Sequence, residues 1–374
     1  MRRPGRHILL GVLAFAVGAL VPAACTTIVE YAPLPPDVVY PSIEPAVDAE
    51  RVAPSLIEWE FEGATVQLTV SVDSAVYHGA KAAQKQALFF REITENEWIP
   101  AYYRAFIDEP HQDPLYDSML QGLRDLRDSL GLDSDRYAEL IVTMVQSLEY
   151  RTDPVYLEPK FPIETVGDAD GDCDDKTLLA SALLAREGYD VAILLFSDEE
   201  HVSLGIRSDG STYGGSGYAI VETTTPFLFG WVPDNLNGEI ELTSEPMVIR
   251  VGTGTRAYGA GTQTDALRAE YERAVAAAHE LAERTSASQA ALEEQAEQAE
   301  AMRTRMEERA AAGDIVGYNE LVPGYNTLAE AYNAAVAAHN ELVAEQTVEV
   351  ETVTRITGGQ SDRLGLARWL GLSG

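Results

Sequence analysis

The feature that most restricts the fold of this chain is a heptad repeat near its carboxy terminus. Residues 318–345 read YNELVPG, YNTLAEA, YNAAVAA and HNELVAE, so Tyr or His returns every seven positions, with Leu or Ala between. In a helix this spacing places both sets on one seam, which needs a second helix to cover it. The seam residues are Tyr318, Leu321, Tyr325, Leu328, Tyr332, Ala335, His339 and Leu342. A row of Asn with the same period lies on the flank of the seam: Asn319, Asn326, Asn333 and Asn340.

The preceding segment supplies the second helix. Residues 265–312 contain no Pro or Gly and are rich in Ala, Glu, Gln and Arg. At 1.5 Å per residue, a helix of this extent is about 70 Å long, which exceeds the diameter of a small domain. Its apolar residues lie on or near a 3-4 repeat: Leu267, Tyr271, Ala274, Ala278, Leu281, Leu292, Ala299, Met302 and Met306.

We therefore predict an antiparallel helical hairpin, or coiled coil, over residues 265–348, followed by a tail at 349–374. Gly313 and Gly317 mark the break between the helices. Pro323 interrupts the first heptad, so we expect the regular second helix to begin near Tyr325. Two interpretations stay open: an arm that binds another protein of the cell envelope, or a self-contained stalk.

The amino terminus has the features of an export signal. Arg2, Arg3 and Arg6 precede 14 apolar or Gly residues at positions 8–21. This run is shorter than the roughly 20 residues that span a bilayer, and its length is typical of a signal peptide, here residues 1–24.

Small residues directly before Cys25 resemble a lipobox, in which the cysteine becomes the lipidated first residue. Pro22 departs from that pattern, and the alternative is ordinary cleavage after Ala23 or Ala24. We expect an exported lipoprotein, anchored to the membrane and facing outside or the periplasm. The Pro-rich residues 25–54 are expected to form an extended tether.

Composition limits the partners. The chain has 60 acidic and 27 basic residues and a net charge of −33, so nucleic acid is an unfavourable partner. The acid excess suits a halophile or an acidic exported protein equally. Cys25 and Cys173 are the two cysteines, which rules out a scaffold of several disulfides.

Residues 55–252 have the pattern of a mixed α/β domain, joined to the helical hairpin by a Gly-rich linker at 253–264. Residues 57–72 alternate apolar and polar about a Gly, which predicts a β-hairpin. Helical spacing extends over 75–106, 115–130 and 138–150, and short strands are predicted at 191–196, 202–206 and 218–222. The buried face of the β-hairpin is expected to hold Trp59, Phe61, Val66, Leu68, Val70 and Val72.

Three residues at the ends of these elements suggest nucleophilic chemistry. Cys173 lies at the start of a helix, His201 directly before a strand and Glu222 at the end of another. Acyl transfer needs such a set: a thiol, an imidazole that takes and returns its proton, and a carboxylate that orients the imidazole. The helix start favours a thiolate, whereas the neighbouring carboxylates oppose it. Each residue taken alone is equally compatible with a structural role.

The sequence around these residues resembles the transglutaminase-like superfamily, over about residues 55–252. The resemblance implies a papain-like α+β fold and places Cys173 as nucleophile, His201 as base and Glu222 as third member, where Asp is commoner. It also implies protein or peptide amides as substrates, by hydrolysis or transfer, without a cofactor. The segments that carry it are FPIET at 161–165, GDCDDK at 171–176, LLASALL at 178–184, GY at 188–189, EHV at 200–202, VETT at 221–224 and GW at 230–231.

Two further expectations concern the surroundings of Cys173. The oxyanion donors are expected to be the backbone N–H of Cys173 and, as a side-chain candidate, Gln146. The alternating carboxylates of residues 168–174 fail the spacing of an EF-hand, so we expect no metal site. Instead, Asp172 and Asp175 are expected to cap the helix, with Lys176 offsetting their charge.

Two classes of function follow. The first is an exported cysteine amidase, peptidase or acyltransferase. The second is a catalytically inactive envelope protein that uses the α/β domain and the helical hairpin for binding.

Overall fold

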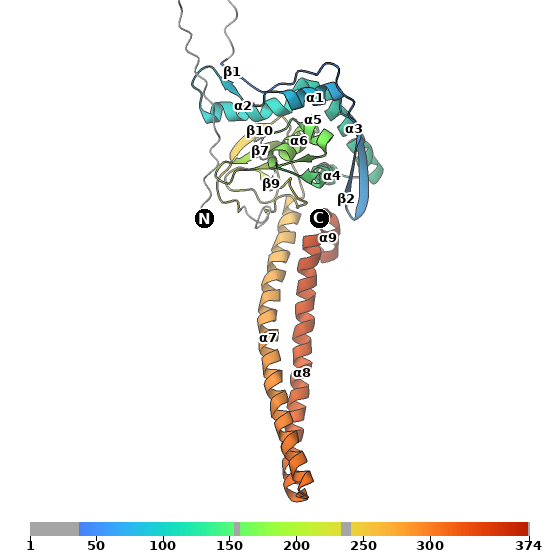
Figure 1. Cartoon of the computed structure of the whole chain (residues 1–374), viewed down its shortest axis with the longest axis vertical. Helices are drawn as coiled ribbons and strands as arrows, with labels where there is room; N and C mark the ends of the chain where they lie inside the picture. Colours follow the sequence, from blue (N-terminus) through green and yellow to red (C-terminus); the bar gives the residue numbers. More distant parts are fainter. Residues whose placement is uncertain (1–36, 153–157, 233–240, 373–374) are drawn as a thin grey trace, which may run out of the picture.

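The computed structural model describes residues 37–152, 158–232 and 241–372, and it shows a mixed α/β head from which a long helical hairpin projects (Figure 1). Helix and sheet are both present in the head, in agreement with the expected α+β class. The predicted signal peptide and Cys25 lie outside the described residues.

The folded head includes residues that are expected from sequence to form the tether. Strand β1 (Val38–Val39) pairs with β4 (Leu88–Phe89), and the Ala46 N–H donates to the carbonyl of Ala75. Ile43 is buried in the main core. The tether predicted at 25–54 is therefore wrong from residue 38 onward, because burial of Ile43 and backbone pairing hold this segment against the head.

A β-hairpin forms one edge of the head. Strands β2 (Ser55–Phe61) and β3 (Ala64–Val70) pair antiparallel through a turn in which Glu62 and Gly63 both have positive φ. Such a two-residue turn matches the twist of the strands. The predicted apolar face is confirmed, since all six of its residues are buried. It packs against α3 (Asp113–Leu130) and α4 (Ser134–Ser147), and Leu68 lies so close to Gly122 of α3 that a Cβ on this glycine would clash.

Helices precede the central sheet, and each begins at a recognisable cap. Asp73 accepts backbone N–H groups at the start of α1, a Thr94–Glu97 capping box begins α2, and Asp133 caps α4. The bounds are α1 (Ser74–Ala82), α2 (Glu95–Ile107), the 3₁₀ turn η1 (Pro110–Gln112), α3 (Asp113–Leu130) and α4 (Ser134–Ser147). Helical spacing over 75–106 therefore covers two helices, and the pairing of β4 with β1 occupies the gap.

The central sheet has four antiparallel strands in the order β10-β7-β8-β9. They are β7 (Val191–Phe196), β8 (His201–Ile206), β9 (Ala219–Val221) and β10 (Met247–Val251). Helix α6 (Cys173–Arg186) packs on this sheet through a fully buried run that includes Leu178, Leu179 and Leu183. The loop before α6 contains α5 (Pro162–Asp168) and a parallel pair of short strands, β5 (Glu149–Tyr150) and β6 (Asp170–Gly171).

The hairpin consists of α7 (Gly261–Ala311) and α8 (Ile315–Gly358), which lie side by side along their length (Figure 1). Beyond the first turn of α7, its buried residues all belong to the predicted seam: Leu267, Ala274, Leu281, Leu292 and Met306. The seam of α8 is half-buried, and its four Asn residues are exposed.

Helix α8 begins before Pro323, so the expected start near Tyr325 is wrong. A proline inside a helix removes one backbone hydrogen bond, here the one that the Asn319 carbonyl would accept. Contacts with α7 along the hairpin stabilise the helix in spite of this loss. At its other end α8 continues to Gly358, through the first part of the expected tail.

The rest of the tail folds back on the base of the hairpin as α9 (Arg363–Leu370). An apolar cluster joins the head, both long helices and α9: Leu228, Trp231, Leu267, Ile356 and Leu366. Beside it the buried Arg363 donates to Glu139 of α4 and to Gln263 of α7, and Glu139 also accepts from Tyr258. These contacts fix the hairpin to the head. None of the described helices has both the length and the hydropathy of a membrane span.

Candidate active site

Cys173 is the first residue of α6, and the acidic residues around it explain why the helix begins there. The Asp172 carboxylate accepts the N–H groups of Asp174 and Asp175, at 3.1 and 3.3 Å, and the Asp175 carboxylate accepts the Asp172 N–H at 3.2 Å. This reciprocal arrangement is a capping box. The expectation that Asp172 and Asp175 cap the helix is confirmed. The Cys173 thiol is free and partly buried.

His201 and Glu222 form a buried pair on neighbouring strands of the sheet. His201 is the first residue of β8, and its Nε2 lies 3.1 Å from Oε2 of Glu222, which follows β9. An ionised carboxylate only accepts, so Nε2 carries the proton and donates it. The hydroxyl of Ser203 lies 3.0 Å from the same Nε2 and donates to Oε2 at 3.4 Å.

The second oxygen of Glu222 is held by the chain that follows it. Oε1 accepts the N–H groups of Thr223 and Thr224, at 2.9 and 2.7 Å, and the Thr224 hydroxyl at 2.6 Å. Burial alone raises the pKa of Glu222, but the hydrogen bonds from His201 and Thr224 outweigh it and hold that pKa below its usual value. Glu222 is therefore ionised at neutral pH and fixed in orientation.

Contacts between α6 and β8 bring Cys173 to this pair. The Thr177 hydroxyl, one turn along α6, donates to the Val202 carbonyl at 3.3 Å and lies 3.0 Å from the Thr223 hydroxyl. The Val202 N–H also interacts with the Cys173 thiol and lowers its pKa. The thiol thus lies beside the residue that follows His201.

Within the described residues, no hydrogen bond joins the Cys173 thiol to the His201 imidazole. Glu222 and Ser203 both engage Nε2, which leaves Nδ1 as the ring nitrogen available to a thiol. The three residues predicted from sequence therefore lie in one region of the head, where His201 and Glu222 are hydrogen-bonded and Cys173 is held beside Val202.

Electrostatics around Cys173 favour the neutral thiol. Burial raises the pKa of Cys173 well above its usual value, and the charges of Asp174 and Asp172 raise it further. Burial likewise raises the pKa of Asp174, and with Asp172 raises that of Asp175 to about 7. The sequence predicts two opposing effects on the pKa of Cys173, a decrease from the helix start and an increase from the carboxylates. The carboxylates together with burial outweigh the helix start.

The acidic loop before Cys173 is neutralised by cations of the protein itself. Asp168 contacts Lys81 at 2.8 Å and Lys160 at 3.2 Å, and Asp170 contacts Lys160 as well as Arg151. Glu164, slightly upstream, contacts Lys85 at 2.8 Å. No cluster of metal-ligating side chains occurs in the described ranges of the chain.

Gln146 does not have the geometry expected of an oxyanion donor. Its Nε2 already donates to the carbonyls of Glu222, at 2.7 Å, and Phe227, at 3.2 Å. Both amide protons are thus engaged, contrary to the prediction. Gln146 instead holds the backbone of Glu222.

Lys176 also differs from its expected role. Its ammonium donates to the carbonyls of Gln146 and Thr224, at 3.2 and 3.3 Å, and within the described residues it forms no ion pair with Asp172 or Asp175. Its side chain is completely buried. The Asp175 carboxylate accepts instead from the backbone N–H of Lys160, whose ammonium contacts Asp170, so the role expected of Lys176 is wrong.

Tyrosine side chains surround the acidic end of α6. Tyr102 and Tyr103 of α2 and Tyr150 of β5 are close enough for the charge of Asp174 to raise their pKa, in addition to the larger effect of burial. An aromatic series leads outward from Tyr102 through Trp98 to Phe89. No motif in the sequence marks these aromatic residues as part of the site.

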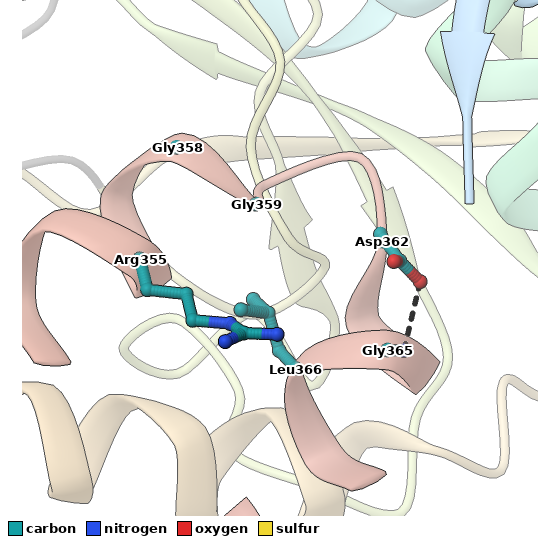
Figure 2. Close-up of a pocket in the computed structure, with 6 residues that line it drawn as sticks. All are labelled: Arg355, Gly358, Gly359, Asp362, Gly365 and Leu366. Atoms are coloured by element: carbon teal, nitrogen blue, oxygen red, sulfur yellow. Dashed lines mark hydrogen bonds between the residues drawn. The ribbon is translucent and has the colours of Figure 1, made fainter. Parts of the chain in front are cut away.

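Two cavities lie away from Cys173, at the base of the hairpin. One, of about 360 Å³, is formed where α8 turns into α9, and Figure 2 shows Asp362 there, accepting the Gly365 N–H at 2.8 Å. The other, of about 610 Å³, is lined by residues of α4, α7 and α9 that include Asp135 and Arg363. Neither is lined by Cys173, His201 or Glu222.

Comparisons with protein-family models, with curated proteins and with solved structures give no match for this chain.

Proposed function

We propose that the protein is a cysteine enzyme that transfers or hydrolyses acyl groups of protein or peptide amides through Cys173, His201 and Glu222. The observation that supports this most is the buried His201–Glu222 pair, whose donor nitrogen and acceptor oxygen are 3.1 Å apart. It lies next to a free thiol at the first turn of a helix. The papain-like core of the transglutaminase-like superfamily, which the sequence resembles, belongs to the same proposal.

The chemistry begins with transfer of the thiol proton to Nδ1 of His201. The resulting thiolate attacks the amide carbon and forms a tetrahedral oxyanion, while Glu222 stabilises the imidazolium through Nε2–H. The imidazolium then protonates the leaving amine as the C–N bond breaks, which leaves a thioester on Cys173. Water or a second amine, losing a proton to His201, attacks the thioester and regenerates the thiol.

An oxyanion donor is available at the nucleophile itself. The side chain of Asp172 accepts from residues 174 and 175, whereas the N–H of Cys173 has no hydrogen-bond acceptor within the described residues. An N–H at a helix start also benefits from the helix dipole. We assign the Cys173 backbone, in place of Gln146, as the donor that stabilises the oxyanion.

The location we propose is the outer face of a membrane, through export and lipidation of Cys25. The support is the basic, apolar and small-residue pattern of the amino terminus. In this arrangement the hairpin is an arm toward a protein of the cell envelope, and the exposed Asn row of α8 is a polar surface for such a partner.

A second candidate function is binding without catalysis. Two observations favour it: the pKa of Cys173 is raised by burial and by Asp174, and no hydrogen bond connects the thiol to His201 within the described residues. In this alternative the His201–Glu222 pair stabilises the sheet, and the head is a binding module.

Alkylation of Cys173 across pH separates the two functions. In the enzyme, replacing His201 by Ala slows the reaction of Cys173 with iodoacetamide, because the imidazole no longer takes the thiol proton. Cys173→Ser, which leaves only Cys25, provides the background rate. A rate equal to that of free cysteine, and unchanged by His201→Ala, supports the binding module and refutes the enzyme.

A further inference from the structure

A buried lysine below the candidate site has no role in the proposed chemistry. Lys176 is fully buried in α6, one turn after Cys173, and within the described residues no carboxylate lies in ion-pair contact with its ammonium. The other lysines of the chain, Lys81, Lys85 and Lys160, each contact a carboxylate of the acidic loop or of α5. A buried cation without a carboxylate in contact is costly unless its protons are hydrogen-bonded.

The two acceptors of Lys176 come from separate parts of the head. Its Nζ donates to the carbonyl of Gln146, near the end of α4, at 3.2 Å. It also donates to the carbonyl of Thr224, in the segment that follows β9, at 3.3 Å. The ammonium therefore bridges two elements that are 78 residues apart in the sequence, as the numbers of Gln146 and Thr224 show.

Both acceptor residues in turn hold Glu222. The Gln146 side chain donates to the Glu222 carbonyl at 2.7 Å, which fixes the backbone. Thr224 donates to Glu222 Oε1 through its N–H and its hydroxyl, which fixes the carboxylate. Lys176 thus contacts the backbone of both residues whose other groups orient Glu222 toward His201.

We propose that Lys176 is a positioning residue of the Cys173–His201–Glu222 site: its ammonium ties α4 to the segment after β9 and so keeps Glu222 against His201. This inference rests on the proposed function for its catalytic consequence, but the positioning itself is a structural statement about Glu222. It explains why a lysine, rather than an apolar residue of similar length, occupies this core position.

The charge on Lys176 suits this role. Burial lowers the pKa of Lys176 to about 8, and the nearby charge of Glu222 opposes that decrease. The ammonium form is therefore retained at neutral pH, and its protons reach two carbonyls at once. A methionine of similar shape fills the same space without donating to either.

The test compares Lys176→Met with Lys81→Met, which removes a lysine that contacts Asp168 and the Tyr77 ring. In a Cys173→Ser background, ¹⁵N NMR of His201 reports which ring nitrogen carries the proton. We expect Nε2–H in the parent and in Lys81→Met, and a mixture of both tautomers in Lys176→Met. With Cys173 intact, we expect Lys176→Met to slow the alkylation of Cys173 about tenfold. This decrease is smaller than the rate enhancement that a general base usually contributes.

Lys176→Gln keeps an amide donor and is expected to preserve the Nε2–H tautomer better than Lys176→Met. If circular dichroism shows that Lys176→Met does not fold, the tautomer of His201 in Lys176→Gln is the measurement that tests the proposal. A pure Nε2–H tautomer of His201 in a folded Lys176→Met protein would overturn the proposal. So would a folded Lys176→Gln protein in which His201 has the same mixture of tautomers as in a protein that lacks the Glu222 carboxylate. Failure of the proposed function looks different: the parent then alkylates like free cysteine, while the tautomer measurement still reports on Lys176.

Discussion

The Arg363 guanidinium of α9 and the Glu139 carboxylate of α4 are paired inside the protein, 224 residues apart in the sequence. Each member of the pair has a second hydrogen-bond partner: Tyr258 donates to Glu139, and Gln263 accepts from Arg363. Through it the carboxy-terminal helix, the base of α7 and the head share one buried polar network.

Removing one member of this network is expected to be strongly destabilising. Arg363→Met removes the charged partner of the buried Glu139 and leaves the hydrogen bond from the Tyr258 hydroxyl, and burial then favours protonation of the carboxylate. The expected loss is about 3 kcal/mol in the free energy of unfolding, measured by urea denaturation at pH 7. Adding Glu139→Gln to this variant should recover part of the loss, and a double variant no more stable than the single one would contradict this account.

Glu222→Gln is expected to slow the alkylation of Cys173. The amide can accept from His201, but it removes the charge that stabilises the imidazolium. The rate with iodoacetamide at pH 7.5 should fall about tenfold or more. Glu60→Gln, an exposed change on β2, is the control and should have no effect.

Asp174→Asn is expected to make Cys173 more reactive. Burial raises the pKa of Asp174 well above its usual value, but the pKa of Cys173 is raised as well, so the thiol ionises at alkaline pH, where Asp174 is charged. The charge of Asp174 is the largest effect after burial that raises the pKa of this thiol, so its removal lowers that pKa. The pH dependence of alkylation should move to lower pH, and the rate at pH 7.5 should rise. Asp168→Asn removes the same charge from a carboxylate paired with Lys81 and is the matched control. An unchanged pH profile for Asp174→Asn would show that this carboxyl group is already protonated.

Lys176 is expected to make stability depend on pH in an unusual direction. The folded pKa of about 8 lies below the ordinary value of 10.5, so the unfolded chain binds more protons between these values. The free energy of unfolding therefore rises with pH through this window. Relative to Lys176→Met, the rise should amount to roughly 3 kcal/mol over the whole window. Urea denaturation of both proteins between pH 7.5 and 10 measures the difference, and parallel curves would contradict it.

Pro323→Ala is expected to stabilise the hairpin. Pro323 is exposed inside α8 and interrupts its hydrogen bonds, and Ala restores one bond without removing a buried contact. A gain of about 1–3 kcal/mol, seen as a higher melting temperature by circular dichroism, is expected. Ala337→Pro, at an equally exposed position two heptads later, should have the opposite effect.

Much of the framework was predictable from local pattern. Alternation about Gly63 gave the β2–β3 hairpin with its buried face, and heptad spacing gave the two long helices. The ends of α6, β8 and β9 placed Cys173, His201 and Glu222 close to each other in the fold, because α6 packs directly on β8.

What sequence reasoning missed depends on partners distant in the chain. The direction of Lys176 is decided by carbonyls of Gln146 and Thr224, and the two protons of Gln146 are taken by carbonyls beyond residue 220. A pattern of residue types does not reveal which backbone carbonyls lack partners. The break between α1 and α2 likewise depends on β1, a strand of two residues.

The positions of β1 and of the long hairpin on the head have a mechanical consequence. Residue 38 lies at β1, on the side of the head opposite to the long hairpin, whose first helix extends about 75 Å (Figure 1). In the arrangement we propose, with an anchored amino terminus and a partner on the hairpin, tension between the two would pass through the whole head. At the upper end it would first load the β1–β4 pair, which has only two residues in each strand. The buried network of Arg363 and Glu139 would resist at the other end, so the amino-terminal segment is the part that would yield first.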